Sequence, residues 1–212
     1  YEPIKWRVLC TDGKQALLLS DIALDDQKYH TVYESVTWET STIRSWLNGY
    51  GAGSNQQSVD YTQKNFIGSA FTASERAAIA DSPLENADNI TYNTEGGNDT
   101  TDRIFLLSES EVWNTDKAES YGFVKDRETG DEARDCQRST YARAMGACGS
   151  WWLRSPGEAE NTVLGVYGGG CVYEYGTHVN YSDHGVRPVL NLNLSFSNLY
   201  TYAGTLCSKK TK

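Results

Sequence analysis

Two apolar segments near the C-terminus enclose a polar segment of different character, and this arrangement constrains the fold most strongly. The first, residues 151–157, has the sequence Trp-Trp-Leu-Arg-Ser-Pro-Gly, and the second, residues 185–192, has Gly-Val-Arg-Pro-Val-Leu-Asn-Leu. Between them, residues 158–184 (the display segment) combine sparse valine and glycine with Tyr, Asn, Ser, Thr, His and acidic residues. We interpret the valines and glycines as a strand-and-turn frame from which the other side chains point outward. Such a composition is typical of a recognition surface rather than a catalytic pocket.

Two features of the display segment favour ligand binding over the plain solvent-exposed face of an antiparallel sheet. The first is its tyrosine content, because a sheet face does not need tyrosine for solubility. Tyrosine supplies contact area at a low cost in conformational entropy and adds a hydroxyl for hydrogen bonds. The tyrosines concerned are Tyr167, Tyr173, Tyr175 and Tyr181.

The second feature concerns the genetic code. Residues 159–184 contain no Lys, Arg, Gln, Met, Trp, Ile, Phe or Pro. Apart from Glu160 and Glu174, every residue in this range can be reached by mutating the two adenines of an asparagine codon. The pattern is suggestive of mutagenesis directed at adenines.

Length and charge limit the class of protein. A chain of 212 residues can form one domain, residues 1–212, that buries roughly 70% of its unfolded surface. No stretch approaches the ~20 apolar residues of a membrane span, so we expect no membrane insertion. The formal charge of −9 argues against nucleic acid and against an anionic membrane surface as partners. Tyr1 is not an initiator methionine, which indicates a processed or trimmed chain.

Local patterns predict short elements separated by long loops. Residues 4–20 carry Asp-Gly between two apolar runs, which is a strong β-hairpin signal. Residues 40–48 space their apolar side chains for a helix, and a capping box predicts another over 73–80. A second capping box, at 108–111, follows an apolar strand at 104–107.

A last helix is predicted over residues 132–145, followed by several short strands. Helices gathered beside antiparallel sheets define the α+β class. We expect Trp151 and Trp152 to face opposite sides of a strand, one in the core and the other beneath the display segment. Arg154 and Arg187 lie in apolar surroundings, and we interpret both as structural.

Metal sites find little support in the sequence. Residues 93–102 hold many oxygen ligands but lack the spacing of a calcium-binding EF-hand, so we favour a turn. Cys171, His178 and His184 are seven and six residues apart, which does not match a zinc motif. We therefore expect no metal and no cofactor.

The cysteines and the missing enzyme motifs argue in the same direction. Five cysteines without regular spacing leave Cys148–Cys171 and Cys10–Cys207 as candidate bridges, and we expect mostly free thiols. The chain lacks the motifs of serine hydrolases, zinc proteases and P-loop proteins. A glycosidase pair of carboxylates stays open, because sequence alone does not place two carboxylates across a cleft.

Several motifs spread over the chain resemble a known family. Besides the two apolar segments near the C-terminus, they are Pro-Ile-Lys-Trp-Arg-Val-Leu at residues 3–9, Thr-Trp-Glu-Thr-Ser-Thr-Ile-Arg-Ser-Trp-Leu-Asn at 37–48 and Gly-Gly-Asn-Asp-Thr-Thr-Asp at 96–102. Together they resemble a domain of unassigned function common in secreted and surface proteins of gut anaerobes. That domain is similar to C-type-lectin-like folds of the formylglycine-generating-enzyme kind, and to the variable proteins of diversity-generating retroelements.

The resemblance implies paired first and last strands and a binding face formed by the late strands and loops. It also implies a frame of Val163, Val166, Val172, Val179 and Gly176. The surface residues implied for ligand binding are Asn161, Leu164, Tyr167, Tyr173, Tyr175, His178, Asn180, Tyr181, Asp183 and His184. The Glu-Pro-Asn or Gln-Pro-Asp motif of calcium-dependent lectins and the catalytic cysteine pair of formylglycine-generating enzymes are both absent.

We therefore expect a non-catalytic domain, of receptor or adhesin type, that binds a protein or glycan ligand on a cell surface. The resemblance implies a secreted, cell-surface or phage-surface location and a display segment diversified by a retroelement. One alternative is a carbohydrate-binding module of fixed specificity. Another is an enzyme related to the formylglycine-generating enzymes.

Overall fold

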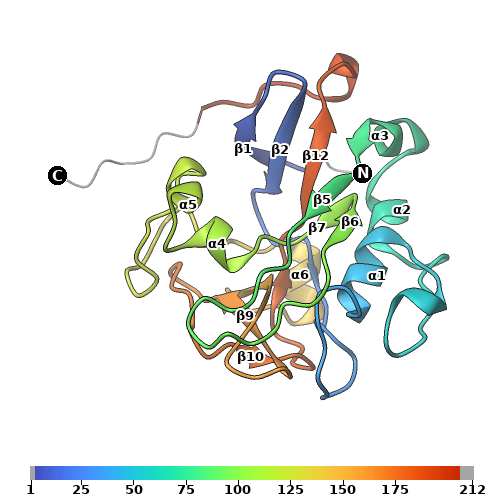
Figure 1. The fold of residues 1–212 in the computed structure, drawn as a ribbon. Helices are drawn as coiled ribbons and strands as arrows, with labels where there is room; N and C mark the ends of the chain where they lie inside the picture. Colours follow the sequence, from blue (N-terminus) through green and yellow to red (C-terminus); the bar gives the residue numbers. More distant parts are fainter. Residues whose placement is uncertain (1–2, 206–212) are drawn as a thin grey trace.

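The computed structural model describes residues 3–205 and is drawn in Figure 1. A hairpin of β1 (Trp6–Thr11) and β2 (Gln15–Ser20) forms one edge of a five-stranded sheet. Gly13 adopts a φ of 86° in the turn, and the Asp12 carboxylate accepts two backbone N–H groups there. The predicted hairpin is confirmed, and its turn is closed by local hydrogen bonds.

The last long strand, β12 (Val189–Asn193), lies beside β2 in the same sheet, with Val189 opposite Leu19. The strand β12 also pairs with β4 (Ile79–Ala80) and β7 (Ile104–Phe105), and all these pairings are antiparallel. The C-terminal strand therefore lies beside the N-terminal hairpin, but it pairs with the second strand, β2, and not with the first strand as the resemblance implied.

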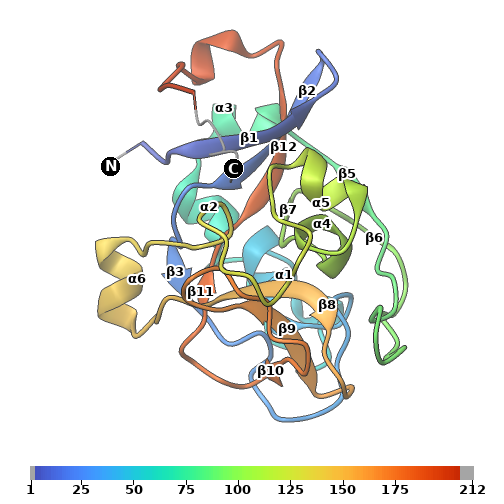
Figure 2. The same cartoon turned by 90° about the vertical axis from the view of Figure 1, so that its left-hand side faces the viewer.

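A second five-stranded sheet lies at the other end of the molecule, where Figures 1 and 2 show β9 and β10. All its pairings are antiparallel except that of β8 with β11. Every residue of β8 and β9 is buried, so both faces of these strands are covered. In sheet order the strands are β10 (Thr177–His178), β9 (Thr162–Val166), β8 (Trp151–Pro156), β11 (Gly185–Val186) and β3 (Asp25–Asp26). A separate pair is formed by β5 (Ser82–Leu84) and β6 (Thr100–Asp102).

Short helices complete an α+β fold with antiparallel sheets. They are α1 (Thr42–Asn48), α2 (Phe66–Ala70), α3 (Ala73–Ala78), α4 (Glu109–Val112), α5 (Asp116–Ser120) and α6 (Thr140–Met145), with 3-10 turns at Ala52–Ser54 and Ser197–Leu199. Both predicted capping boxes are present, at Thr72 and at Ser108. Gly49 ends α1 at a φ of 72°. The helices predicted over 40–48 and 73–80 are confirmed with slightly shorter bounds.

The helix predicted over residues 132–145 is wrong in its first half, because only α6 is helical. Residues 137–139 instead run beside Ala23, which exchanges backbone hydrogen bonds with Gln137 and Ser139. Before them lies Arg134, whose side chain is fully buried and donates hydrogen bonds to five backbone carbonyls. These tertiary bonds outweigh the local helix propensity.

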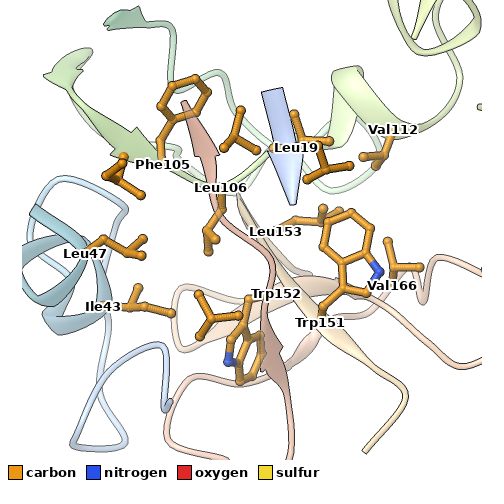
Figure 3. Close-up of a cluster of buried hydrophobic side chains, with 14 of the residues drawn as sticks. Leu19, Ile43, Leu47, Phe105, Leu106, Val112, Trp151, Trp152, Leu153 and Val166 are labelled. Carbon is orange, nitrogen blue, oxygen red and sulfur yellow. The ribbon is translucent and has the colours of Figure 1, made fainter. Parts of the chain in front are cut away.

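The core lies between the two sheets and contains both adjacent tryptophans (Figure 3). Trp151 and Trp152 are each 0% exposed. The Trp151 indole donates to the carbonyl of Arg134 at 3.0 Å, and the Trp152 indole donates to that of Gln27 at 2.8 Å. Trp152 also stacks on His184 of the display segment, with ring centroids 4.1 Å apart. The prediction that one indole lies beneath this segment is therefore confirmed.

The two arginines predicted to be structural are buried and bonded inside the protein. Arg154 donates to the Leu106 carbonyl at 2.8 Å and to the Glu111 carboxylate at 2.6 Å. Burial alone would raise the pKa of Glu111, but Arg154 and a nearby lysine hold this pKa at about 2. Arg187 donates to the Ser20 carbonyl at 2.8 Å and lies over the Trp151 ring.

A buried carboxylate joins two of the motifs on which the family resemblance rests. Asp102, at the end of β6, accepts hydrogen bonds from the Trp38 indole at 3.0 Å and the Arg44 guanidinium at 2.8 Å. The hydroxyls of Tyr50 and Thr100 donate to it at 3.0 and 2.8 Å. One carboxylate therefore ties residues 37–50 to β6, which gives a structural role to Trp38 and Arg44 of the first motif and to Thr100 and Asp102 of the second.

Candidate ligand-binding face

The display segment contains β9 and β10, which pair with each other, and it ends directly before β11. Gly170 and Gly176, at φ values of 82° and 79°, allow it to lie close against the domain. A Cβ atom on Gly170 would lie 2.1 Å from the Asp131 carbonyl oxygen, and one on Gly176 would lie 2.9 Å from that of Val163. Both positions therefore exclude any side chain, and the backbone of the segment is held in place.

The valine frame is buried as expected, with exposures of 1%, 0%, 4% and 0% for Val163, Val166, Val172 and Val179. Gly176, the fifth frame residue, is half-buried. The alternation of apolar and polar residues in the display segment therefore separates frame from surface at these positions.

Eight of the ten residues expected at the surface are at least partly exposed. Those classed as exposed are Tyr173, Tyr175, His178, Tyr181 and Asp183, and those half-buried are Asn161, Tyr167 and Asn180.

Two of the ten expectations are wrong: Leu164 is 0% exposed and His184 only 2%. Leu164 lies within β9, where both faces are covered, so alternation does not bring it to the surface. His184 is buried because its ring stacks on Trp152 directly before β11.

Six of the ten residues line one hollow of about 430 Å³, the display hollow. They are Tyr167, Tyr173, His178, Tyr181, Asp183 and His184. This volume lies within the range of about 300–1,000 Å³ typical of ligand pockets. Tyr175 lies beside it, with its ring 5.4 Å from that of Tyr173.

A continuous chain of aromatic rings crosses this face and enters the core. From the surface inward, neighbouring centroids are 6.0, 5.4, 5.4, 5.6 and 4.1 Å apart, which lie close to or within the usual range for aromatic pairs. The rings, in order, are those of Tyr92, Tyr175, Tyr173, Tyr167, His184 and Trp152. Each ring in this series therefore packs against the next, from the surface to the core.

His184 contributes a polar group at the inner end of this chain. Its Nδ1 lies 2.8 Å from a carboxylate oxygen of Asp183, and its buried Nε2 makes no hydrogen bond with any described residue. Burial lowers the pKa of His184, although Asp183 opposes this effect. The imidazole is therefore neutral at neutral pH. Cys148 lines the same hollow, and no hydrogen bond links its thiol to His184 within the described part of the chain.

Residues far away in the sequence complete the face. Tyr92 extends the aromatic chain, and Tyr33 packs on His178 with centroids 4.7 Å apart. Cys148 and Ser150 line the display hollow from the segment before β8. No pattern near these residues marks them as binding residues, because only the path of the chain brings them to the display segment.

A second hollow, of about 310 Å³, meets the first at consecutive residues of the display segment, and we call it the Asp26 hollow. Ser182 lines this hollow, whereas Tyr181 and Asp183 line the display hollow. Asp26 is 9% exposed, and its Oδ1 has no hydrogen-bond partner among the described residues. Burial, followed by the charges of Asp25 and Asp183, raises the pKa of Asp26 to about 6.

This unpaired carboxylate leads to a pH-dependent prediction. The pKa of Asp26 is about 6 in the folded protein, above its ordinary value of 3.8. Its contribution to stability is therefore full below pH 3.8 and is lost as the pH rises through 6. We expect Asp26→Asn to raise the free energy of unfolding by about 1–2 kcal/mol at pH 7.5, allowing for water at the exposed edge of the group.

The gain should disappear at pH 4, where both proteins carry a neutral side chain. Urea unfolding at the two pH values measures the difference. Asp81→Asn, at an exposed position, is the control and should change stability little at either pH. A loss of stability in Asp26→Asn at pH 7.5 would mean that the carboxylate makes a stabilising bond.

Residues 93–99 form a loop in which Asn93 and Gly97 adopt positive φ values, but residues 100–102 belong to β6, so the turn predicted over 93–102 ends earlier than expected. A Cβ atom on Gly96 would lie 2.1 Å from the Asn86 carbonyl oxygen, so the chain passes itself too closely for a side chain there. The Asp99 carboxylate accepts the Asn86 N–H at 3.0 Å. Within residues 3–205, no group of three or more His, Cys, Asp or Glu is arranged to hold a metal ion.

The described cysteines, Cys10, Cys136, Cys148 and Cys171, are free thiols. The candidate Cys148–Cys171 bridge is therefore absent. The other candidate pairs Cys10 with Cys207, and Cys207 lies outside the described residues.

Residues 13–194 match a protein family described as "Domain of unknown function (DUF6273)". The chain belongs to this family. The matched range of DUF6273 includes the display segment, the Asp26 hollow and the Asp102 carboxylate with its partners. No curated protein and no solved structure matches the chain. Among the helices of the described DUF6273 chain, none is long and apolar enough to span a bilayer.

Proposed function

We propose that this domain is a non-catalytic, ligand-binding module of receptor or adhesin type, and that the ligand binds to the tyrosines around the display hollow. The observation that carries the proposal is the chain of stacked rings from Tyr92 to Trp152, with Tyr173 and Tyr175 exposed. A contiguous patch of exposed aromatic side chains on a protein surface often marks a binding site.

Affinity would come from burying these rings against the ligand, with hydroxyl groups supplying hydrogen bonds. Because the rings already pack on each other and on a buried frame, little side-chain entropy is lost when the ligand binds. An aromatic ring suits both the side chains of a protein and the flat faces of a sugar, so the proposed ligand is a protein or a glycan.

The finer fold assignment, a C-type-lectin-like domain, is part of this proposal. It is supported by the pairing of β2 with β12 and by the position of the display segment between the late strands. Retroelement diversification is supported by the restricted set of residues in the display segment. Sequencing the coding locus across many clones tests it, because a near-copy that differs at adenines beside a reverse transcriptase is expected. An invariant locus without such a copy would favour a module of fixed specificity.

The binding proposal is tested by replacing both Tyr173 and Tyr175 with alanine. The wild-type domain is probed on a glycan array and with a random peptide library. We expect the double variant to lose at least 100-fold in affinity for the ligands found, because each aromatic hot spot contributes about 2 kcal/mol or more. Thermal unfolding should change little, because Tyr173 and Tyr175 are 48% and 41% exposed.

Tyr141→Ala is the matched control, because Tyr141 is 57% exposed on α6 and does not line either hollow. It should keep full affinity. Binding that survives in the double variant would contradict the proposal. Unfolding of the double variant would show instead that these tyrosines belong to the core.

A further inference from the structure

We propose that the Asp26 hollow receives a cationic side chain, lysine or arginine, from a partner polypeptide. The rest of the partner would lie on the display face, by which we mean the display hollow together with Tyr175 and Tyr92. The first part of this inference stands by itself. The second part rests on the proposed function and assigns the ligand to the polypeptide class rather than to the glycans.

The first observation is the unpaired carboxylate itself. Asp26 is 91% buried, because only 9% of its surface is exposed, and no described residue donates a hydrogen bond to its side chain. Buried charges in proteins are normally paired. The nearby carboxylates of Asp25 and Asp183 add negative charge rather than compensate it. A cationic side chain would pair with this carboxylate and offset the charge of its two neighbours.

The second observation is the lining of the hollow. Besides Asp26, it includes the rings of Trp46 and Tyr61 and the apolar side chains of Ile43 and Met145. Aromatic faces attract ammonium and guanidinium groups, and the aliphatic stem of a lysine or arginine packs on apolar side chains. A carboxylate, aromatic rings and an apolar wall together suit such a side chain.

The third observation concerns size and position. At about 310 Å³ the hollow has room for a lysine or arginine side chain. Ser182 lines it, and the two residues on either side of Ser182, Tyr181 and Asp183, line the display hollow. A polypeptide on the display face can therefore reach both hollows. The chain's net charge of −9 favours the approach of a basic partner.

Lys28 is the competing cation within the chain. It is exposed and lines the same hollow, but within residues 3–205 it forms no ion pair with Asp26. A test of this site therefore has to distinguish binding of an external cation at Asp26 from neutralisation of Asp26 by Lys28.

The experiment follows the Trp46 indole N–H and the Gly146 amide of the ¹⁵N-labelled domain by NMR. Gly146 lies beside Asp26, because a Cβ atom on it would be 3.0 Å from the Asp26 Oδ2. The probes are the N-acetyl methylamides of lysine, arginine and norleucine, together with n-butylammonium. We expect saturable shifts with the lysine and arginine probes, with a Kd of about 1–10 mM, and none with the uncharged norleucine probe. Asp26→Asn should weaken binding at least tenfold, because the charge-assisted hydrogen bond is lost.

Further arms separate the parts of the proposal. Tyr173→Ala/Tyr175→Ala should keep the lysine probe bound, so failure of the proposed function and failure of this site give different results. Tighter binding of the lysine probe than of n-butylammonium supports a polypeptide, and equal binding overturns that part. Lys28→Ala should keep or raise the affinity. Three results would overturn the proposed site. They are binding seen only in Lys28→Ala, equal binding of the norleucine and lysine probes, and unchanged binding in Asp26→Asn.

Discussion

Replacing Asp102 with asparagine is expected to lower the free energy of unfolding by about 3–5 kcal/mol, the usual cost of breaking a buried ion pair from one side. The Asp102 side chain is 0% exposed and bonds the Arg44 guanidinium, which is itself 13% exposed. Asparagine keeps the shape but turns one acceptor into a donor that faces other donors. Arg44 would then keep its charge without a partner, because guanidinium does not deprotonate in proteins.

Urea unfolding at pH 7 measures this effect, with Asp81→Asn as the control. Asp81 pairs with Arg103 at 3.6 Å, but its side chain is 75% exposed. A surface pair of this kind contributes only about 0–1 kcal/mol. Equal effects of the two substitutions would show that Asp102 does not join residues 37–50 to β6 as described.

Replacing Arg134 with methionine is expected to cost a similar amount, about 3–5 kcal/mol, and to loosen the display segment as well. Methionine fills much of the volume but donates no hydrogen bond. Five backbone carbonyls lose their donor, those of Val112, Val124, Asp126, Thr129 and Gly170. The buried Asp131 carboxylate, 3.5 Å from Arg134, loses its cation.

Because the Gly170 carbonyl belongs to the display segment, hydrogen exchange should accelerate there before the whole domain unfolds. Residues 124–131 should become sensitive to proteases for the same reason. Arg143→Met, at an exposed position on α6, is the control and should change stability by less than about 0.5 kcal/mol. Unchanged exchange around Gly170 in Arg134→Met would contradict this role of Arg134.

These two residues also illustrate which features a sequence can predict. The hairpin at Asp12 and Gly13 and the capping boxes at Thr72 and Ser108 were predicted correctly. Each depends on groups within a few residues of each other, so the local sequence holds all the information. The helix over 132–145 was wrong because the partners of Arg134 come from three other segments.

The candidate ligand-binding face likewise combines features that the local sequence predicts with features that only tertiary contacts decide. Alternation in residues 158–184 predicts the buried valines and the exposed Tyr173, Tyr175 and Tyr181. The alternation fails at Leu164, because it distinguishes two faces of a strand only when one of them is exposed to solvent. Both faces of β9 are covered. The alternation fails at His184, because a ring can leave the surface by stacking on a distant tryptophan.

By itself, the sequence determined the class of fold, the hairpin, the caps and the tyrosines available for binding, since these follow from composition and from contacts along the chain. Only the tertiary structure decided that Tyr33 and Tyr92 join those tyrosines. It alone placed Asp26, whose Oδ1 has no hydrogen-bond partner among residues 3–205, in a hollow lined by Trp46. The physical reason is that stacking and burial depend on distances in space, and residues far apart in sequence become neighbours only when the sheets pack.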